Sequence, residues 1–511
     1  MAFSCSGPES DQPLLTAEVP LHLEEHIDAA MIEGSEIPED LPAVVEWRFD
    51  EPQPEWSPVD HPDSKNRPIE TRLTEDSLRL FLGNNNASVD PFGKQLLQGG
   101  IYVEVPEWKR EDWAYIVVRA RSSENINEIR IGFNLRERPG FTALEHDPFL
   151  FSNESVKIIN DGMEHTYLMR ADWSWEDWED PWKQLIVLVR SDKPAHLDIL
   201  SVSVIPKGVK YAGTSVGVQT EIRNEIYRRT LFVHTPAKLA FRVQVPESGR
   251  LDIGLGLLRD DVPVTFQINA KPDRDDSKTL LNESYSDKKH WAQRSVDLSD
   301  YEDQIITLTL QATADQNGTV ALWGAPTISG KRVTNLPNII FYIIDGAGAD
   351  YLSVYGYNRR TTPNLERLAE EGAVLENAFS NSSWTKPSTP SFMTSLHHSV
   401  LGGYKTESDP LPDQAVTMAE HLHQAGYQTA VFTTNPFAGS LSSLERGVDV
   451  MQDSECSPNS RSSEVLHEDF WKWRESYPGQ PYWVHFQTTD VHWPFKPPAP
   501  FAGVYVEPKL R

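Results

Sequence analysis

Three residues near the end of the chain have the side chains that hydrolysis of a charged ester requires. Asp345 follows the apolar run 339–344, Thr385 lies in Ser-Trp-Thr-Lys-Pro-Ser, and His492 lies in Asp-Val-His-Trp-Pro. Cleaving a sulfate or phosphate ester calls for an in-line nucleophile, a cation against the equatorial oxygens and a proton donor for the leaving oxygen. We predict Thr385 as the nucleophile, Asp345 and Thr385 as ligands of a divalent metal ion, and His492 as the proton donor.

The elements around these residues favour those roles. The run 339–344 is rich in β-branched and aromatic residues and reads as a buried strand, which places Asp345 at its carboxyl end. Ligands of open α/β sheets collect at that edge, where a carboxylate suits a hard or borderline cation. Bonding to a metal is one way to activate the hydroxyl of Thr385. Ser388 would cap a helix that begins near Pro387, whose free N–H groups favour an oxyanion.

Each residue taken singly also has an ordinary structural interpretation. Asp345 fits a turn after a strand, Thr385 a loop or a helix cap, and His492 a structural histidine. Asp345 and the glycines after it also resemble a weak dinucleotide loop, but a third glycine is missing and the acid would repel a pyrophosphate. Weaker candidates for substrate binding are Lys386, Ser388, Asn435 and His485. We expect His421 and His423 to be surface residues of a helix over 416–424.

The order of the motifs after Leu336 resembles that of the sulfatases of the alkaline phosphatase superfamily. The matching segments are Asp345-Gly346, 352–357, 361–365, 371–373, 377–379, 385–388, 425–430 and 490–495. The resemblance implies an α/β alkaline-phosphatase-like domain, a metal-dependent hydrolase of sulfate or phosphate esters, and calcium, manganese or zinc as the metal. It also implies a sulfated or phosphorylated glycan, or a lipid headgroup, as the substrate.

The chain departs from the sulfatase pattern at the nucleophile. Sulfatases carry Cys or Ser at the position of Thr385 and Arg four residues later, where this chain has Thr389, so we expect no formylglycine. Threonine at this position is similar to the phosphoglycerol and phosphoethanolamine transferases of the superfamily, which form a phospho-threonine. Gly346 stands where a second acid is expected, and 433–436 replaces the Lys-x-His of sulfatases.

The α/β domain is expected to be truncated at its C-terminus. The family usually has a second stretch with Asp-Asn or Asp-His that completes the metal site, and only a proline-rich stretch follows His492. The chain is then a fragment, is completed by a partner, or is inactive. Two classes of function therefore stay open: an ester hydrolase or headgroup transferase, and a non-catalytic glycan-binding protein with a relic sulfatase-like domain.

Composition indicates a folded, acidic, multidomain protein. At ~150 residues a domain, the length predicts about three domains. The formal net charge of −28 argues against nucleic acid and against anionic membrane surfaces as partners. No apolar run reaches the length of a transmembrane helix, and two cysteines cannot form a disulfide framework.

The start of the chain favours an extracytoplasmic location. Small residues precede Cys5, and a Pro/Glu/Ser-rich tether follows it, as in the remains of a lipoprotein signal. We therefore expect a periplasmic protein or a lipoprotein whose signal is incomplete in this chain. A disordered cytoplasmic N-terminus is the alternative.

Strand-like runs fill the chain before residue 334. We predict a flexible acidic leader over 1–43, a β-sandwich module over 44–207, a second one over 208–333, and the sulfatase-like α/β domain over 334–511. Both modules are expected to be jelly-roll-like, because short runs of strand type recur between turn residues. Trp173, Trp175, Trp178 and Trp182 could stack against sugar rings, although such residues more often pack a core.

Overall fold

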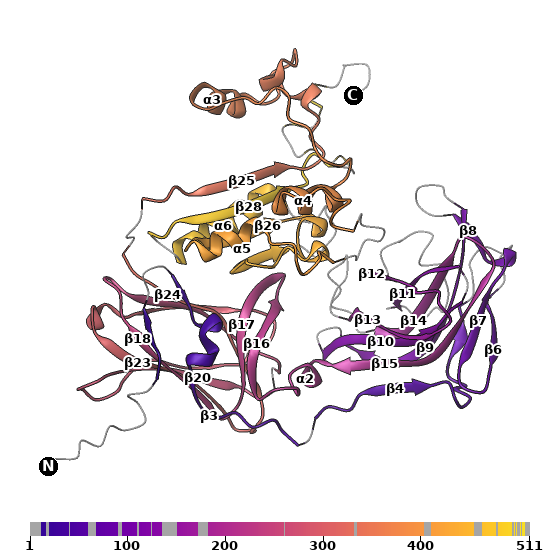
Figure 1. Ribbon diagram of the computed structural model, residues 1–511, viewed down its shortest axis with the longest axis horizontal. Coiled ribbons are helices and arrows are strands. Elements are labelled where there is room, and N and C mark those ends of the chain that lie inside the picture. Colours follow the sequence, from indigo (N-terminus) through magenta and orange to yellow (C-terminus); the bar gives the residue numbers. More distant parts are fainter. Residues whose placement is uncertain are drawn as a thin grey trace.

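The computed structural model contains two β-sandwiches and an α/β layer, which lie side by side in Figure 1. The structure describes residues 12–16, 20–39, 41–59, 68–89, 95–109, 112–123, 125–134, 151–171, 182–259, 261–331, 335–402, 410–453, 462–476, 479–492, 495, 497, 501 and 503–505. None of the helices in these ranges has both the length and the apolar character that crossing a bilayer requires.

The first sandwich packs two six-stranded sheets against each other. One sheet has the order β13 (Glu164–Arg170), β10 (Trp113–Arg121), β15 (Ala195–Pro206), β7 (Leu78–Leu82) and β6 (Glu70–Leu73), with β4 (Val45–Arg48) on β15. The other has β12 (Phe151–Lys157), β11 (Ile126–Asn134), β14 (Trp182–Ser191), β9 (Gln95–Trp108) and β5 (Ser57–Pro58), with β8 (Ala87–Val89) on β9. Every second residue of β10 is buried, as a strand with one face on a core requires.

Most strands of the second sandwich follow the short helix α2 (Lys207–Lys210), and three short strands come from the N-terminal segment. Its first sheet contains β1 (Leu14–Thr16), β18 (Ala237–Gln244), β23 (Ile305–Ala314), β20 (Val264–Pro272) and β21 (Lys278–Tyr285), with β3 (Met31–Gly34) on β18. The facing strands are β22 (Ala292–Asp297), β19 (Arg250–Leu257), β24 (Val320–Ser329) and β17 (Ile226–His234), with β16 (Val216–Arg223) on β17 and β2 (Leu21–His22) on β24. One apolar cluster fills the space between them.

The described part of the segment 1–43 is not the flexible leader that we expected. Residues 14–16 pair with β18, residues 21–22 pair with β24, and residues 31–34 pair with β18. The one-turn elements of η2 (Leu23–Ala29) connect β2 to β3. Leu21 and Leu23 are buried in the core of the second sandwich, so burial of these apolar side chains outweighs the acidic character of the segment.

The sheet of the second sandwich continues into the α/β domain. β17 pairs antiparallel with β27 (Val450–Asp453), and β26 (Gln428–Thr433), β28 (Tyr482–Thr488) and β25 (Ile339–Ile344) follow as parallel strands. The result is one ten-stranded sheet. Residues of α4 (Thr385–Thr394) and α5 (Met418–Gln424) pack on one face of its parallel part, and α6 (Ser463–Ser476) packs on the other.

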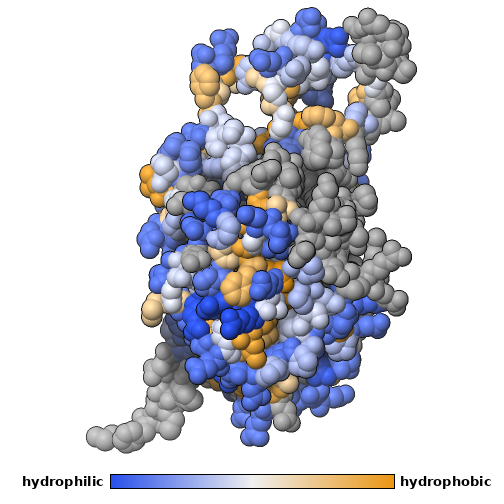
Figure 2. Space-filling view, turned by 90° about the vertical axis from the view of Figure 1, so that its right-hand side faces the viewer, coloured by the Kyte–Doolittle hydropathy of each residue, from blue (hydrophilic) through white to orange (hydrophobic). Residues whose placement is uncertain are grey.

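A long segment after β25 projects from the domain at the top of Figure 1. It contains η6 (Ala349–Tyr351), η7 (Ser353–Tyr355) and α3 (Pro363–Glu371), and none of residues 346–384 is buried. Its exposed apolar side chains include Leu368, Leu375 and Phe379. Figure 2 shows apolar residues among hydrophilic ones at the same end of the molecule.

The remaining short helices are η3 (Asn84–Asn86), η5 (Ser299–Tyr301), η8 (Pro436–Ala438) and η9 (Ser440–Ser442).

Trp182 lies in the core of the first sandwich with 2% exposure, so it is not available for sugar stacking. Trp173, Trp175, Trp178 and both cysteines lie outside the described residues.

Candidate active site

Asp345 and Thr385 meet at the carboxyl edge of the parallel strands. Asp345 directly follows β25, and its N–H donates to the carbonyl of Thr488, which continues the pairing with β28. Thr385 is the first residue of α4. Its hydroxyl donates to Oδ2 of Asp345 at 3.2 Å. The structure thus brings together the predicted nucleophile and the predicted metal ligand.

Asn435 joins this pair from the end of β26. Its Nδ2 donates to Asp345 Oδ2 at 2.6 Å and to Thr385 Oγ1 at 3.1 Å. Its Oδ1 accepts the N–H of Phe437 at 3.0 Å, which caps η8 and fixes which end of the amide faces the site. The side chain therefore presents N–H groups, not an oxygen, to Asp345 and Thr385.

Gln487 is a fourth member of the site that the sequence analysis missed. It lies on β28 beside Ile343 of β25 and Thr433 of β26, and its Nε2 donates to Asp345 Oδ2 at 3.0 Å. A polar residue after the mostly apolar run 483–486, near the carboxyl end of a predicted strand, could have pointed to Gln487. We missed it because no familiar motif contains it.

The side chains of the site suit an ion that prefers oxygen ligands. The three donors to Asp345 are neutral, so none of them compensates the charge of the carboxylate. Oε1 of Gln487 is buried and has no hydrogen-bond partner among the described residues. A carboxylate, a hydroxyl and an unpartnered amide oxygen are the ligand types that calcium and other hard cations take.

His492 lies close to Gly346, the residue that follows Asp345. A Cβ at Gly346 would lie 3.1 Å from Cα and 3.5 Å from Cδ2 of His492. Gly346 also has a φ of +77°, a conformation that side-chain-bearing residues rarely adopt. These two constraints explain why a glycine stands where the related pattern has a second acid. The direction of the His492 imidazole relative to Thr385 stays a prediction.

Of the weaker substrate-binding candidates, Asn435 lies in the site, whereas Lys386 and Ser388 make hydrogen bonds outside it. Lys386 is fully buried and donates to the carbonyl of Leu441, and Ser388 donates to the carbonyl of Ser382 and pairs with Ser380. Ser388 does not cap α4, because the helix begins at Thr385 and its N-cap position is Trp384.

His485 is also remote from the predicted role. Its ring lies 5.9 Å from that of Phe341 and 6.1 Å from that of Phe392, and neither nitrogen has a hydrogen-bond partner among the described residues. Burial lowers the pKa of its imidazole to about 3. His485 is therefore a neutral residue of the core beneath the site.

Comparison with known proteins identifies the α/β part of the chain. Residues 337–509 match the model of the sulfatase family, and this part of the chain is a sulfatase-family domain. An N-acetylgalactosamine-6-O-sulfatase of Bacteroides thetaiotaomicron is 36% identical over 99 residues, 19% of this chain and 19% of that protein. An ulvan-active sulfatase of Formosa agariphila is 27% identical over 183 residues, 32% of this chain and 28% of that protein.

These matches cover a small part of each relative. The chain spans about a fifth of the length of the first curated relatives that it matches. Among solved structures, a phosphonate monoester hydrolase of Agrobacterium radiobacter is similar with 17% identity and a TM-score of 0.28, over 32% of this chain and 43% of that chain. A likeness at this TM-score adds nothing to the assignment of the domain.

Proposed function

We propose that the sulfatase-family domain hydrolyses sulfate or phosphate esters with Thr385 as the nucleophile. The observation that carries this proposal is the convergence of Thr385, Asp345 and Asn435, whose polar atoms lie 2.6 to 3.2 Å apart. They meet at the carboxyl edge of parallel strands, where α/β enzymes bind their substrates. The match to the sulfatase family supports the same reaction class.

The proposed reaction has two steps, in which the side chains act as follows. Oγ1 of Thr385 forms a bond to the sulfur or phosphorus, the bond from that atom to the ester oxygen breaks, and the hydroxyl proton passes to Asp345 Oδ2. His492 gives a proton to the leaving alkoxide. Water then attacks the same sulfur or phosphorus, the bond from that atom to Oγ1 of Thr385 breaks, one proton of the water passes to His492, and sulfate or phosphate leaves. Asp345 returns the proton to Thr385.

A divalent cation, which we expect to be calcium, manganese or zinc, is part of the proposal. Asp345 and Thr385 would hold it, with Oε1 of Gln487 as a further oxygen. Such an ion would neutralise charge on the transferred group and favour the alkoxide form of the nucleophile. Because residue 385 is threonine, we expect no formylglycine.

The proposed substrate is a sulfated glycan, with phosphorylated glycans and lipid headgroups as alternatives. Two relatives are named for sulfated sugars, one for N-acetylgalactosamine 6-O-sulfate and one for ulvan, which supports this choice. The β-sandwiches would present the glycan to the domain. We expect such a protein outside the cytoplasm, where these polymers occur.

A headgroup transferase is the second candidate, and Thr385 is the observation that favours it. A threonine ester of phosphate would then pass its phosphoryl group to an acceptor alcohol instead of to water. A non-catalytic glycan-binding protein is the third possibility, and it predicts no turnover at all.

The test compares Thr385→Ala and Thr385→Ser with wild type on 4-nitrophenyl sulfate and 4-nitrophenyl phosphate, with each of the three metals. We expect Thr385→Ala to lose at least about 100-fold in rate and Thr385→Ser to keep part of it. Thr394→Ala is the matched control, because Thr394 lies at the far end of α4 and bonds the carbonyl of Pro390. Equal rates for wild type and Thr385→Ala would exclude the proposed nucleophile.

Intact-mass measurement separates the remaining possibilities. One phosphoryl group added to wild type but not to Thr385→Ala, with slow release into water and fast release to an alcohol, would favour the transferase. Absence of both turnover and adduct in wild type, together with binding to a sulfated glycan, would favour the non-catalytic protein.

A further inference from the structure

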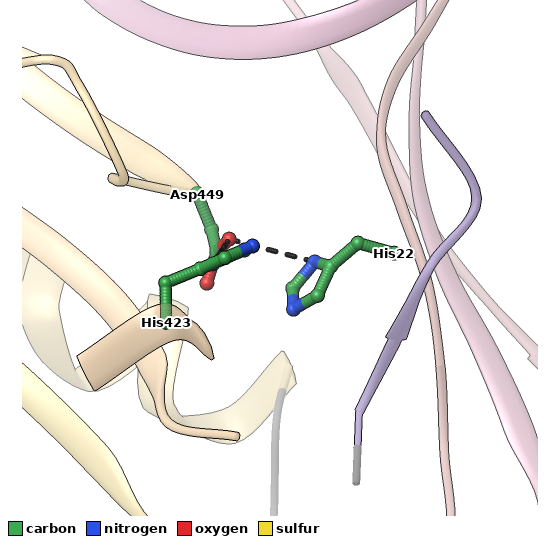
Figure 3. A group of neighbouring side chains, drawn as sticks. All are labelled: His22, His423 and Asp449. Carbon is green, nitrogen blue, oxygen red and sulfur yellow. Dashed lines mark ion pairs between the residues drawn. The ribbon is translucent and has the colours of Figure 1, made fainter. Parts of the chain in front are cut away.

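A second cluster of polar side chains lies at the opposite edge of the parallel strands. His22 ends β2, His423 lies near the end of α5, and Asp449 immediately precedes β27. Figure 3 shows the imidazole of His423 beside the Asp449 carboxylate and the imidazole of His22 facing them. The cluster thus joins the N-terminal segment, which pairs with the second sandwich, to a helix and a strand of the sulfatase-family domain.

The spacing of the three side chains matches that of metal ligands. Nδ1 of His423 lies 2.9 Å and Nδ1 of His22 lies 3.5 Å from Oδ1 of Asp449, and one atom from each residue lies within 4.8 Å of the others. Ligands about 2.1 Å from a tetrahedral zinc ion are separated by ~3.4 Å. The two measured separations lie on either side of that value.

The hydrogen bonds around Asp449 and His423 leave one ligand atom of each for the cluster, whereas Nδ1 of His22 also lies 3.3 Å from Oγ1 of Thr327. Oδ2 of Asp449 accepts the N–H of Thr429 at 2.7 Å, which leaves Oδ1 for the cluster. Nε2 of His423 lies 3.0 Å from Oε1 of Glu25, as in metal sites where a carboxylate orients a histidine. If Nε2 donates this bond, the lone pair of His423 Nδ1 faces the Asp449 carboxylate, and only a proton or a metal ion between them makes that contact favourable.

Buried atoms without partners give a second, independent indication of a ligand. Glu24 is 2% exposed and His22 is 4% exposed. Both carboxylate oxygens of Glu24 and Nε2 of His22 lack hydrogen-bond partners among the described residues. Oε1 of Glu24 lies 3.9 Å from Nδ1 of His22. A buried carboxylate without a partner is unfavourable by several kcal/mol or more, and a cation beside it removes that cost.

We propose that His22, His423 and Asp449 bind a divalent zinc-like metal ion that fastens the N-terminal segment to the sulfatase-family domain. Two imidazoles and a carboxylate suit zinc, and the buried carboxyl group of Glu24, whose Oε1 lies 3.9 Å from Nδ1 of His22, can complete the set after a side-chain shift. The ion is separate from the one proposed at Asp345, because the two sites lie at opposite ends of the parallel strands.

Metal analysis of the tag-free chain, prepared with zinc and then dialysed, tests the proposal. We expect wild type to hold about one zinc ion more per chain than His423→Gln and Asp449→Asn, which retain only the zinc bound at Asp345. His421→Gln is the matched control, since His421 lies on the same helix, is exposed and is outside the cluster. A zinc content in His423→Gln equal to that of wild type would overturn the assignment.

Two measurements on wild type make the test independent of whether the variants fold. A chelator should lower the Tm of wild type and of His421→Gln by about 5 °C or more, and added zinc should restore it. Cobalt(II) titrated into the metal-free chain should give the strong visible absorption of a tetrahedral site at one equivalent. No effect of chelator on Tm and no such absorption would mean that a protonated histidine alone links the carboxylates.

Discussion

The hydroxyl of Thr385 donates a hydrogen bond to the carboxylate of Asp345 at 3.2 Å, across 40 residues of sequence. Most of the intervening chain projects away from the domain and none of residues 346–384 is buried. The contact is therefore held by the two elements at its ends. Asp345 is fixed by the pairing of β25 with β28, and Thr385 by the packing of α4 on the sheet.

Replacement of Asn435 by alanine should slow turnover more than it destabilises the domain. The change removes the amide that donates to both Asp345 and Thr385, and hydrogen bonds to a charged group contribute about 1.5–3 kcal/mol. We expect kcat to fall about ten-fold or more, measured on a 4-nitrophenyl ester. Asn364→Ala on the exposed helix α3 serves as the control. A kcat equal to that of wild type would show that Asn435 does not position the pair.

His492→Gln should affect poor leaving groups most. If His492 protonates the leaving oxygen, its loss matters more for an alkyl ester, whose alkoxide is strongly basic, than for an activated aryl ester. The measurement is the ratio of kcat/KM for the two ester types in wild type and variant. An equal loss on both esters would remove the proton-donor role from His492.

Gly346→Ala should destabilise the domain, whereas Gly348→Ala should not. Gly346 has a φ of +77° and would place its Cβ 3.1 Å from Cα of His492. Gly348 has a φ of −86°, and its nearest contact would be 3.5 Å. We expect a loss of roughly 1–3 kcal/mol for Gly346→Ala from urea unfolding. A similar effect of both variants would contradict the strain that we assign to Gly346.

His485 should make the domain less stable in acid. Burial lowers the pKa of its imidazole from 6.5 to about 3 in the folded protein, so below pH 6.5 the unfolded chain binds a proton that the folded one does not. Stability is then fully present above pH 6.5 and falls toward pH 3, by up to ~1.4 kcal/mol per pH unit for this residue.

Unfolding measured from pH 7 to pH 4 tests this expectation with His485→Leu. Leucine fills the position in the core and cannot take up a proton. The free energy of unfolding of the variant should therefore depend less on pH than that of wild type. His421→Gln, which changes an exposed histidine, should follow wild type. A wild-type slope retained in His485→Leu would assign the acid sensitivity to other groups.

The sequence by itself determined the local elements around Asp345 and Thr385. The run 339–344 could be recognised as a strand from its length and its β-branched and aromatic residues, which places Asp345 at its end. The expectation that this strand is buried was wrong, since β25 ends the strand order of the sheet and none of its residues is buried. The sandwich strands were recognisable for the same reason, since burial of one strand face imposes alternation on the sequence, as β10 shows.

Only the tertiary structure decided which polar side chains meet. Lys386, next to Thr385 in sequence, turns to the carbonyl of Leu441, while Gln487, remote from it, bonds Asp345. His423, expected on the surface, is half-buried because β17 extends the sheet to β27 and brings His22 against α5. A sequence pattern shows which face of a single helix or strand is apolar and how often the apolar residues recur. Contacts between elements depend on the register and packing of several, which no local pattern contains.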